Sequence, residues 1–362
     1  MAMISTPFLP VPPVRYGGTE LVVGDLCEGL REAGHDVTLF TVGESRAPVR
    51  CASLYRRGVW PPDPYHEANH AAWAIGEIVA GDIAYDVIHA HVAALLPLGR
   101  FAPAPVVYTL HHDRSEELTR FYAMQRGVRF VAISERQREL VPELSDVDVV
   151  YHGVDAGRYP LGRGGEAAAF LGRIALEKGA HTAIDVARAA GVPLLIAGEA
   201  HWKDRAYYQR EIAPRLGTPG LRLVGEVDHV EKIALLGGAC ALLFPVAWEE
   251  PFGLVMVESM LCGTPVLALP RGSVPEIVDQ GVTGFLCADA REMAERLVAI
   301  ARNGFDRARC RARAVERFGR ARMARDYLRV YLHASERALG AATAAGVDPR
   351  LEVVDGPFGE RA

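Results

Sequence analysis

The segment Pro245–Gly263, PVAWEEPFGLVMVESMLCG, contains a strand-to-helix transition of the kind found in parallel α/β sheets. The apolar run Ala241–Phe244 before it predicts a buried strand, and the apolar spacing after it predicts a helix over Gly253–Leu261. The acidic residues Glu249 and Glu250 lie in the loop between these two elements. Ligands of such sheets bind where strands end and helices begin, so this loop is a candidate binding site.

Short apolar strands alternate with amphipathic helices along nearly the whole chain. Strands are expected at residues 3–5, 37–41, 87–91, 106–110, 130–133 and 147–151, and again at 168–171, 194–197, 221–224, 241–244 and 265–268. Helices are expected at residues 19–33, 182–190, 206–216, 230–236, 253–261 and 290–301. This pattern predicts the α/β class, with two doubly wound, Rossmann-like domains of parallel sheet that face a central cleft.

The length of 362 residues is about twice that of a usual single domain, which favours two separate cores. The expected domains are residues 1–155 and 156–319, and the segment His152–Glu166 between them, with five glycines, is the expected hinge. A last helix over residues 320–339 is expected to pack back on the first domain. Residues 340–362 are expected to form a loosely packed tail.

Composition excludes several classes of protein. A net charge of −5 and a pI of about 6.2 give no general attraction to nucleic acid, so no nucleic-acid partner is expected. The six cysteines are far apart and form no Cys-x-x-Cys pair, which predicts reduced thiols. No apolar stretch is long enough to span a bilayer, and the first residues do not read as a signal peptide. We therefore expect a cytoplasmic protein.

Two carboxylates stand out in the opening segment. Glu250 lies before the expected helix, and Glu258 lies about a turn and a half inside it. Between them, Phe252 and Gly253 form the start of the helix, where free backbone N–H groups suit a phosphate or a sugar hydroxyl. The carboxylates can accept hydrogen bonds from a ligand rich in hydroxyl groups. The alternative interpretation is a surface helix with ordinary glutamates.

Glu250-Pro251-Phe252-Gly253-Leu254 followed by Glu258 resembles the Glu-x7-Glu signature of retaining glycosyltransferase family 4, which has the two-domain GT-B fold. The resemblance extends along the chain to about Leu339. It implies that Glu258 holds the ribose of a nucleotide-sugar donor. It also implies that Glu250, with the backbone amides of Phe252, Gly253 and Leu254, holds the donor sugar.

Two further segments fit the resemblance. Arg173 and Lys178 flank a turn after the first strand of the second half, and the resemblance implies that they neutralise the departing diphosphate. Taken alone, this turn would be an ordinary solvated one. Gly17 and Gly18 follow the first strand and open a helix, so their backbone can approach phosphate or sugar closely. The resemblance implies that this loop closes on the donor.

The histidines at strand ends leave three alternatives open. His89 and His91 share one face of a strand and could chelate a metal, could be purely structural, or could contact the substrate. The pair His111-His112 follows the next strand. The resemblance favours His111 as the histidine that faces the transferred sugar, with His112 as a neighbouring ambiguity.

Ten arginines in the stretch Arg302–Arg329 form a basic region that could contact anionic lipid headgroups at the inner face of a membrane. Solvated helix faces are the alternative. The sequence leaves both interpretations open.

We expect a retaining, metal-independent glycosyltransferase that moves a hexose-type sugar from a UDP- or GDP-linked donor to a hydroxyl acceptor, without a further cofactor. The acceptor pocket is expected in loops such as Gly43–Asn69. The alternatives are a sugar-nucleotide epimerase, a glycan phosphorylase, or a non-catalytic nucleotide-sugar-binding protein of the same fold. The sequence does not indicate the acceptor or the oligomeric state.

Overall fold

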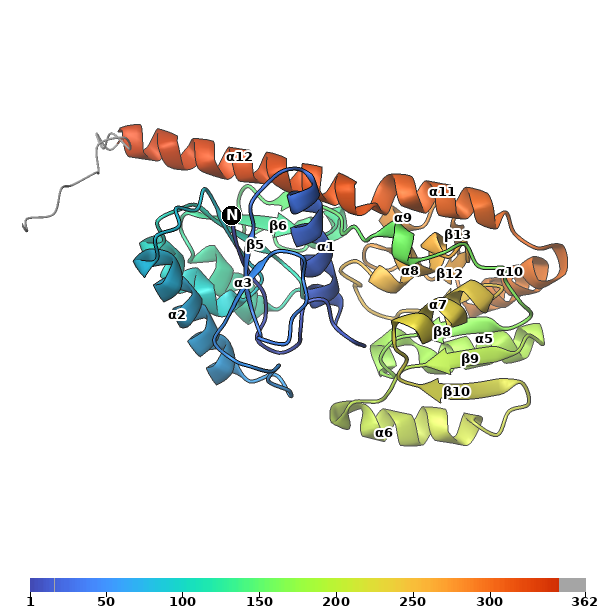
Figure 1. Ribbon diagram of the computed structural model, residues 1–362. Helices are drawn as coiled ribbons and strands as arrows, with labels where there is room; N and C mark the ends of the chain where they lie inside the picture. Colours follow the sequence, from blue (N-terminus) through green and yellow to red (C-terminus); the bar gives the residue numbers. More distant parts are fainter. Residues whose placement is uncertain (16, 345–362) are drawn as a thin grey trace, which may run out of the picture.

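The computed structural model describes residues 1–15 and 17–344, with only the backbone for 339–344. Two parallel sheets lie side by side, each between layers of helices (Figure 1). The first sheet has the order β3-β2-β1-β4-β5-β6-β7 and the second β10-β9-β8-β11-β12-β13. The strands of the first sheet are β1 (Ala2–Ile4), β2 (Thr38–Thr41), β3 (Arg50–Ser53), β4 (Ile88–Ala90), β5 (Val106–Thr109), β6 (Val128–Ala132) and β7 (Asp148–Val149). Those of the second are β8 (Ala168–Leu171), β9 (Leu194–Ala197), β10 (Leu221–Gly225), β11 (Leu242–Phe244), β12 (Val266–Ala268) and β13 (Gly284–Leu286).

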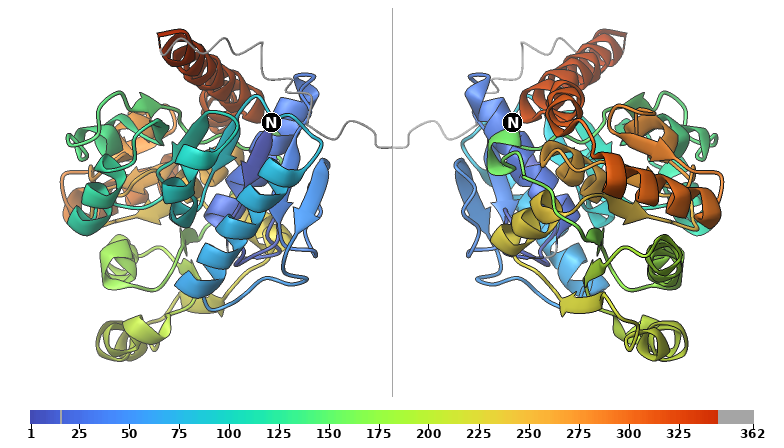
Figure 2. Two further views of the ribbon diagram at one scale, coloured as in Figure 1. Left: turned by 90° about the vertical axis from the view of Figure 1, so that its left-hand side faces the viewer. Right: turned by 90° about the vertical axis from the view of Figure 1, so that its right-hand side faces the viewer.

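Helices cover both faces of each sheet, as the alternating pattern predicts (Figure 2). The longer helices are α1 (Gly18–Glu32), α2 (Pro64–Ala80), α3 (Glu116–Ala123), α5 (Ala180–Ala190), α7 (His229–Gly238), α8 (Leu254–Leu261), α10 (Ala290–Asn303), α11 (Arg307–Phe318) and α12 (Arg320–Ala344). Short ones are α4 (Glu135–Glu139), α6 (Arg205–Tyr207), α9 (Val274–Ile277), η1 (Ala93–Phe101), η2 (Ala156–Arg158), η3 (Leu176–Lys178), η4 (Trp202–Asp204), η5 (Tyr208–Ile212) and η6 (Ala213–Arg215). The expected fold class is therefore confirmed.

Some elements differ from the expectation. The predicted loop Gly43–Asn69 contains the edge strand β3 and the start of α2, so the loop expectation was wrong. The strand is polar and largely exposed, and the buried face of α2 consists of His70, two alanines and Ile78, so neither shows a clear apolar period. The predicted helix over residues 206–216 is broken into α6, η5 and η6, because Pro214 lacks the N–H that a continuous helix needs.

The C-terminal end also differs. Helix α12 continues to Ala344, so the first residues of the expected tail are helical, and the rest of that expectation falls on residues 345–362, outside the described part. As expected, α12 lies along α1 of the first domain (Figure 1). Its Tyr327 and Tyr331 are buried in the core that also holds Val22 and Leu26 of α1. This packing fixes the last helix to the domain where the chain begins.

The chain passes between the two domains twice, after β7 and between α11 and α12, and these two segments are hydrogen-bonded to each other. The backbone N–H of Val154 donates to Phe318 O at 3.0 Å, and that of Arg320 donates to Val154 O at 3.0 Å. A Cβ on Gly153 would lie 2.8 Å from Gly319 O, so only glycine allows this close approach. Arg320 also pairs with Glu28 at 2.6 Å and with Glu32 at 2.7 Å on α1. The expected hinge is thus paired with the start of α12.

Candidate active site between the two sheets

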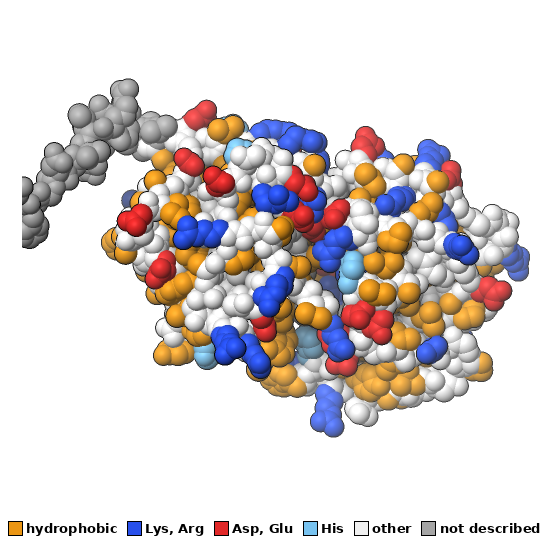
Figure 3. All heavy atoms as spheres, in the orientation of Figure 1, with side chains coloured by type: hydrophobic (Ala, Val, Ile, Leu, Met, Phe, Trp, Pro, Cys, Tyr) orange, Lys and Arg blue, Asp and Glu red, His pale blue; other side chains and the backbone are white. Residues whose placement is uncertain are grey.

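The loops at the carboxyl ends of both sheets meet each other. Glu276, after β12, accepts hydrogen bonds from the backbone N–H groups of Glu135 at 2.8 Å and Arg136 at 2.7 Å, which follow β6. Arg136 also pairs with Glu249 at 2.7 Å. Charged side chains of both signs lie side by side where the two halves of the molecule meet (Figure 3). Strand-end loops of both sheets therefore contact each other at the domain boundary, where the cleft was expected.

Glu250 lies where three loops of the second sheet join. Its side chain is 7% exposed, and Oε2 accepts from Lys178 Nζ at 2.6 Å and from Trp248 Nε1 at 2.9 Å. Its backbone carbonyl accepts from the N–H of Ser273 at 2.9 Å. Lys178 follows β8, Trp248 follows β11 and Ser273 follows β12, so the carboxylate ties these loops together. The structure thus brings together two of the predicted site residues, Glu250 and Lys178.

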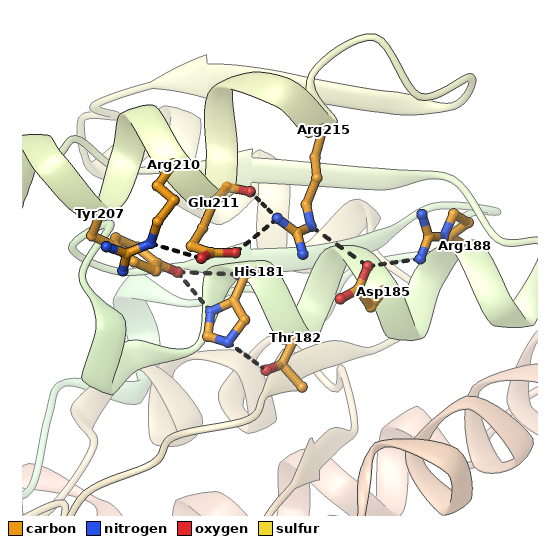
Figure 4. Close-up of polar contacts among 8 residues, drawn as sticks. All are labelled: His181, Thr182, Asp185, Arg188, Tyr207, Arg210, Glu211 and Arg215. Atoms are coloured by element: carbon orange, nitrogen blue, oxygen red, sulfur yellow. Dashed lines mark hydrogen bonds and ion pairs between the residues drawn. The ribbon is translucent and has the colours of Figure 1, made fainter.

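Helix α5 begins directly after Lys178 and is held by a polar cluster (Figure 4). His181 Nδ1 lies 2.8 Å from the Tyr207 hydroxyl, and Arg215 joins Asp185 of α5 to Glu211 at 3.6 and 3.0 Å. Gly179, in the left-handed region at φ 74°, is pressed against Pro245, where a Cβ would lie 2.2 Å from the carbonyl oxygen. These contacts fix the position of the Lys178 backbone relative to the loop that carries Glu250.

Glu258 has a separate environment on α8. It is 5% exposed, and its Oε1 accepts from the Tyr159 hydroxyl at 2.8 Å and from Lys232 Nζ of α7. Its other oxygen, Oε2, makes no hydrogen bond within the described part of the protein. The two glutamates of the motif therefore occupy different surroundings, Glu250 in the loop before α8 and Glu258 on that helix.

Arg173 is also paired with carboxylates. Its guanidinium donates to Asp204 Oδ2 at 3.0 Å and to Glu177. Both partners flank the strand ends of β8 and β9, so they hold the guanidinium at the sheet edge. The structure thus places Arg173 and Lys178 on one turn, each with an acidic partner.

The turn before α8 is built around glycine. Gly253 is the N-cap at φ 75°, and a Cβ there would lie 2.6 Å from Met256 Cε and 3.2 Å from Phe244 Cζ. Phe252 is buried, whereas Leu254 packs against the cores of both domains. The predicted helix start is therefore confirmed, and its first turn lies at the domain boundary.

Gly17 is the N-cap of α1 and Gly18 is its first residue, and a loop joins them to β1. Gly17 has a φ of 141°, and nothing lies within 4 Å of a Cβ built on Gly18, so the space beside it is open. Glu20, in the first turn, is buried and accepts from Thr6 Oγ1, and burial raises the pKa of its carboxyl. Arg15, just before this turn, lies 3.6 Å from Glu226 of the other domain. The glycine turn thus faces the second sheet.

Four histidines form a chain of contacts at the carboxyl edge of the first sheet. Both ring nitrogens of His89 are occupied, Nδ1 by the Tyr331 hydroxyl at 2.8 Å and Nε2 by Thr109 at 2.8 Å, which favours the structural alternative for this residue. His91 Nδ1 lies 2.7 Å from His111 Nε2, and the His111 ring stacks on His152 at 5.5 Å. Burial lowers the pKa of all four: to about 3 for His89 and His152, and well below the usual range for His91 and His111.

The chain of rings reaches the second domain. His152 contacts Phe252 edge-on at 4.9 Å, so His111 is one ring away from the turn that begins α8. His112, by contrast, is exposed and lines a small hollow with Leu110 and Gln137. The geometry therefore separates the two neighbouring histidines that the sequence leaves ambiguous. No group of three or more His, Cys, Asp or Glu side chains in the described residues is arranged to hold a metal ion.

Most arginine side chains of the basic region Arg302–Arg329 bind other parts of the protein. Arg307 donates to the carbonyl oxygens of Gly162, Ala239 and Gly237 at 3.0 Å each, and Arg311 donates to that of Ala156 at 2.9 Å. Other arginines of the region form ion pairs: Arg313 and Arg317 with Asp279, Arg320 with Glu28, and Arg329 with Asp326. Arg322 donates a hydrogen bond to the backbone carbonyl of Tyr151. Most of the run therefore binds loops and connections inside the protein and is not a free cationic face.

Three residues of the site escaped the sequence analysis: Tyr159, Lys232 and Trp248. A signal for one of them was present, because the chain has only three lysines, Lys178, Lys203 and Lys232. Two of these three pair with the two glutamates of the motif. All six cysteines are free thiols, and none of the described helices is both long and apolar enough to cross a membrane.

Comparison with known proteins identifies the class. Residues 16–158 match the model of Glycosyltransferase Family 4, and residues 159–317 match that of Glycosyl transferases group 1. Glycogen synthase from Mycobacterium tuberculosis (strain ATCC 25618 / H37Rv) is 30% identical over 347 residues, which span 80% of this chain and 83% of that protein. The chain belongs to the family 4 glycosyltransferases of GT-B fold, and it is a glycosyltransferase. This class replaces the epimerase and phosphorylase alternatives.

Other relatives agree with this assignment. A phosphatidyl-myo-inositol mannosyltransferase from Mycolicibacterium smegmatis (strain ATCC 700084 / mc(2)155) is 28% identical, with 84% of this chain and 86% of that protein covered. The crystal structure of AviGT4, a glycosyltransferase involved in avilamycin A biosynthesis, has 26% identity and a TM-score of 0.71, with 92% and 97% covered. Sucrose-phosphate synthase from Thermosynechococcus elongatus, at 20% identity, shares the fold with a TM-score of 0.77, and 94% of this chain and 99% of that chain are covered.

Proposed function

We propose that this glycosyltransferase is a retaining, metal-independent enzyme that moves a hexose-type sugar from a UDP- or GDP-linked donor to a hydroxyl acceptor. One observation carries the proposal. Two buried carboxylates, Glu250 and Glu258, lie on either side of the N-terminus of α8, and each is held by one of the chain's three lysines. Such a site offers hydrogen-bond acceptors for sugar and ribose hydroxyls and cations for a diphosphate.

In this proposal the donor lies across the carboxyl edge of the second sheet. The ribose hydroxyls donate to Glu258, whose Oε2 is free of protein partners within the described residues. The diphosphate lies against Arg173 and Lys178, whose charges stabilise it as it leaves. The hexose then reaches Glu250 and the backbone amides of Phe252, Gly253 and Leu254, with His111 and the Gly17–Gly18 turn closing from the first domain.

Lys178 has two partners in this scheme. In the free protein its ammonium is paired with Glu250, and cation–π contact with Trp248 at 4.5 Å also holds it. A diphosphate that binds here shares this ammonium with the carboxylate. The two charged groups thus place the departing phosphate next to the sugar that Glu250 holds, which is the geometry that transfer requires.

Two features support the finer parts of this proposal: the Glu-x7-Glu motif for retention, and the side-chain cations Arg173 and Lys178 for independence of metal. The Glu-x7-Glu resemblance supports retention. Arg173 and Lys178 supply positive charge beside the leaving group, which is the role that a divalent cation plays in other phosphate sites. We therefore assign the charge stabilisation to side chains and to the N-terminus of α8.

We place the acceptor on the first domain. Loops after β1, β2 and β3 are tied together by Val59 N–H to Pro7 O at 2.9 Å and by Gly43 N–H to Tyr55 O at 2.9 Å. These loops carry the exposed Arg46, Arg56 and Arg57, and none of the three pairs with a carboxylate in the described part of the chain. This basic rim suits an acceptor that bears a phosphate. The mannosyltransferase relatives are named for such an acceptor, phosphatidyl-myo-inositol.

We also propose a cytoplasmic location, which the six free thiols support. Peripheral contact with a membrane would fall to Arg302, Arg309 and Arg325, the arginines of the basic region whose side chains make no hydrogen bond or ion pair to described protein groups. A vesicle-binding measurement with the triple alanine variant of these residues tests this contact.

The test of the proposed function begins with donor choice. Thermal shift with a panel of UDP- and GDP-linked sugars should single out one donor, and hydrolysis of that donor by the enzyme alone separates an enzyme from a non-catalytic binding protein. With an acceptor found, the anomeric signal of the product in ¹H NMR decides retention. A product with the opposite anomeric configuration from the donor would overturn the retaining assignment.

A further inference from the structure

His91 and His111 share one short contact in the chain of histidines. His91 Nδ1 lies 2.7 Å from His111 Nε2, and the other nitrogen of His91, Nε2, lies 3.1 Å from Met3 Sδ. His91 is 4% exposed and Met3 is fully buried on β1, so this end of the chain is fixed by the core of the first sheet. Each ring nitrogen of His91 therefore has one defined partner, His111 for Nδ1 and Met3 for Nε2.

The hydrogen positions follow from the partners. A thioether sulfur carries no hydrogen, so the contact with Met3 is a hydrogen bond only when His91 Nε2 carries the proton. Burial and the neighbouring histidines lower the pKa of both His91 and His111, so each ring is neutral and has one N–H. His91 Nδ1 is then an acceptor, and His111 Nε2–H must be the donor between them.

The remaining nitrogen of His111 is consequently bare. His111 Nδ1 makes no hydrogen bond to described protein atoms, and it is not among the buried polar atoms that lack a partner, so it is open to solvent. The ring is held in place by its stacking on His152 at an interplanar angle of 23°. A neutral nitrogen with a free lone pair at this position can only accept, and a sugar hydroxyl is a suitable donor.

We propose that His91 is a positioning residue that fixes His111 in the Nε2–H tautomer, so that His111 Nδ1 accepts a hydrogen bond from a hydroxyl of the transferred sugar. The hydrogen bond to the sugar rests on the proposed function, whereas the tautomer of His111 does not. His89 cannot take the same role, because both of its ring nitrogens bind Tyr331 and Thr109.

The tautomer is measured directly by long-range ¹H–¹⁵N NMR of histidine-labelled, deuterated full-length protein without nucleotide. The signals are assigned by their loss in the His91→Leu and His111→Gln variants. We expect the Nε2–H tautomer for both residues in the wild type. An Nδ1–H tautomer of His111 would overturn the proposal, whether or not the protein transfers a sugar.

The functional consequence is tested with two variants of nearly equal size. His91→Asn places an amide oxygen near the position of Nδ1 and keeps an acceptor for His111, whereas His91→Leu removes it. We expect kcat/KM for the donor to fall about tenfold or more in the Leu variant and to stay within about threefold of wild type in the Asn variant. The dissociation constant for the nucleoside diphosphate should not change in either, because His111 faces the sugar. Equal losses in the two variants, or no loss in either, would contradict the proposal.

Tyr331→Phe is the matched control for damage to this core. It removes the hydroxyl that binds His89 Nδ1, in the same buried cluster, without touching His91 or His111. The midpoint of thermal unfolding should fall in this variant while kcat/KM stays at the wild-type value. A loss of kcat/KM similar to that of His91→Leu would show that destabilisation alone explains the effect.

Discussion

Lys178 Nζ lies 2.6 Å from Glu250 Oε2, so the turn after β8 and the loop after β11 are joined by an ion pair at the domain boundary. A second ion pair of this kind joins Lys232 of α7 to Glu258 of α8. Each carboxylate therefore keeps a cation in place before any donor binds. This arrangement divides the site into a part for the reacting sugar and a part for the nucleoside.

Glu250→Gln should lower kcat more than it changes KM for the donor. Glutamine keeps the shape of the side chain but lacks the charge that stabilises positive character developing on the sugar. The variant also frees Lys178 from its ion pair, so affinity for the nucleoside diphosphate should not fall. Steady-state kinetics and a nucleotide titration check both points, and an unchanged kcat would reverse the role given to this residue.

Glu258→Ala should chiefly weaken donor binding, by about 1.5–3 kcal/mol, because a ribose contact is made in the ground state and the transition state alike. It also leaves Lys232 half-buried without its carboxylate, which lowers stability. The double variant Glu258→Ala/Lys232→Met should regain stability without regaining affinity. Turnover abolished at unchanged donor affinity would count against the ribose assignment.

Activity should survive EDTA, because the positive charge beside the diphosphate comes from Arg173 and Lys178. The measurement compares initial rates of transfer or donor hydrolysis before and after chelation. Complete loss in EDTA, with recovery on addition of magnesium or manganese, would refute metal independence.

The double variant Arg56→Ala/Arg57→Ala should raise KM for inositol phosphate about tenfold more than it raises KM for unphosphorylated inositol. The reason is that exposed guanidinium groups bind a phosphate through charge-assisted hydrogen bonds. The donor dissociation constant should stay the same. Arg100→Ala, an exposed arginine of η1 shortly before the start of β5, is the control. An equal increase in KM for both acceptors would show that the basic rim does not bind the acceptor phosphate.

Stability should depend on pH through His152. Burial, with a contribution from Arg322, lowers the pKa of this ring to about 3, against about 6.5 in an unfolded chain. The unfolded chain therefore binds more protons below pH 6.5, and the stability of the folded protein is lost as the pH falls from about 6.5 towards 3. His152→Phe keeps the ring but removes the titration.

The free energy of unfolding of His152→Phe, relative to that of wild type, should be about 2 kcal/mol higher at pH 5 than at pH 8. Urea unfolding at the two pH values measures the difference. His35→Phe, at an exposed position, is the control. The same result for both variants would show that burial of His152 does not control this dependence.

The sequence predicted most strands of both sheets, because each central strand is a short apolar run bounded by turn residues. It missed β3, which is a polar edge strand, and β13, an edge strand that begins at Gly284. It also missed α2, whose buried side consists mainly of small residues and His70. These elements are specified by their neighbours in the fold more than by their own apolar period.

For the candidate site, the sequence pointed to Glu250, Glu258 and Lys178, but not to the side chains that hold them. Tyr159 lies 99 positions before Glu258 in the sequence, and Lys232 lies 26 positions before it. Such pairs depend on how the two sheets and α7 pack, which no local pattern shows. The arginines of Arg302–Arg329 illustrate the same limit, because the carbonyl groups they bind come from distant loops.

The central claim is that a nucleoside diphosphate binds beside Arg173 and Lys178 in this cleft. Calorimetric titration of UDP and GDP in the presence of EDTA tests it most directly, with Lys203→Ala as a control at the third lysine, which is exposed. We predict that wild type and the control bind one of the two nucleotides equally well. Arg173→Ala and Lys178→Ala should each weaken that binding by about 1.5–3 kcal/mol. Wild-type affinity in both variants, or no binding of either nucleotide to the wild-type protein, would contradict the account.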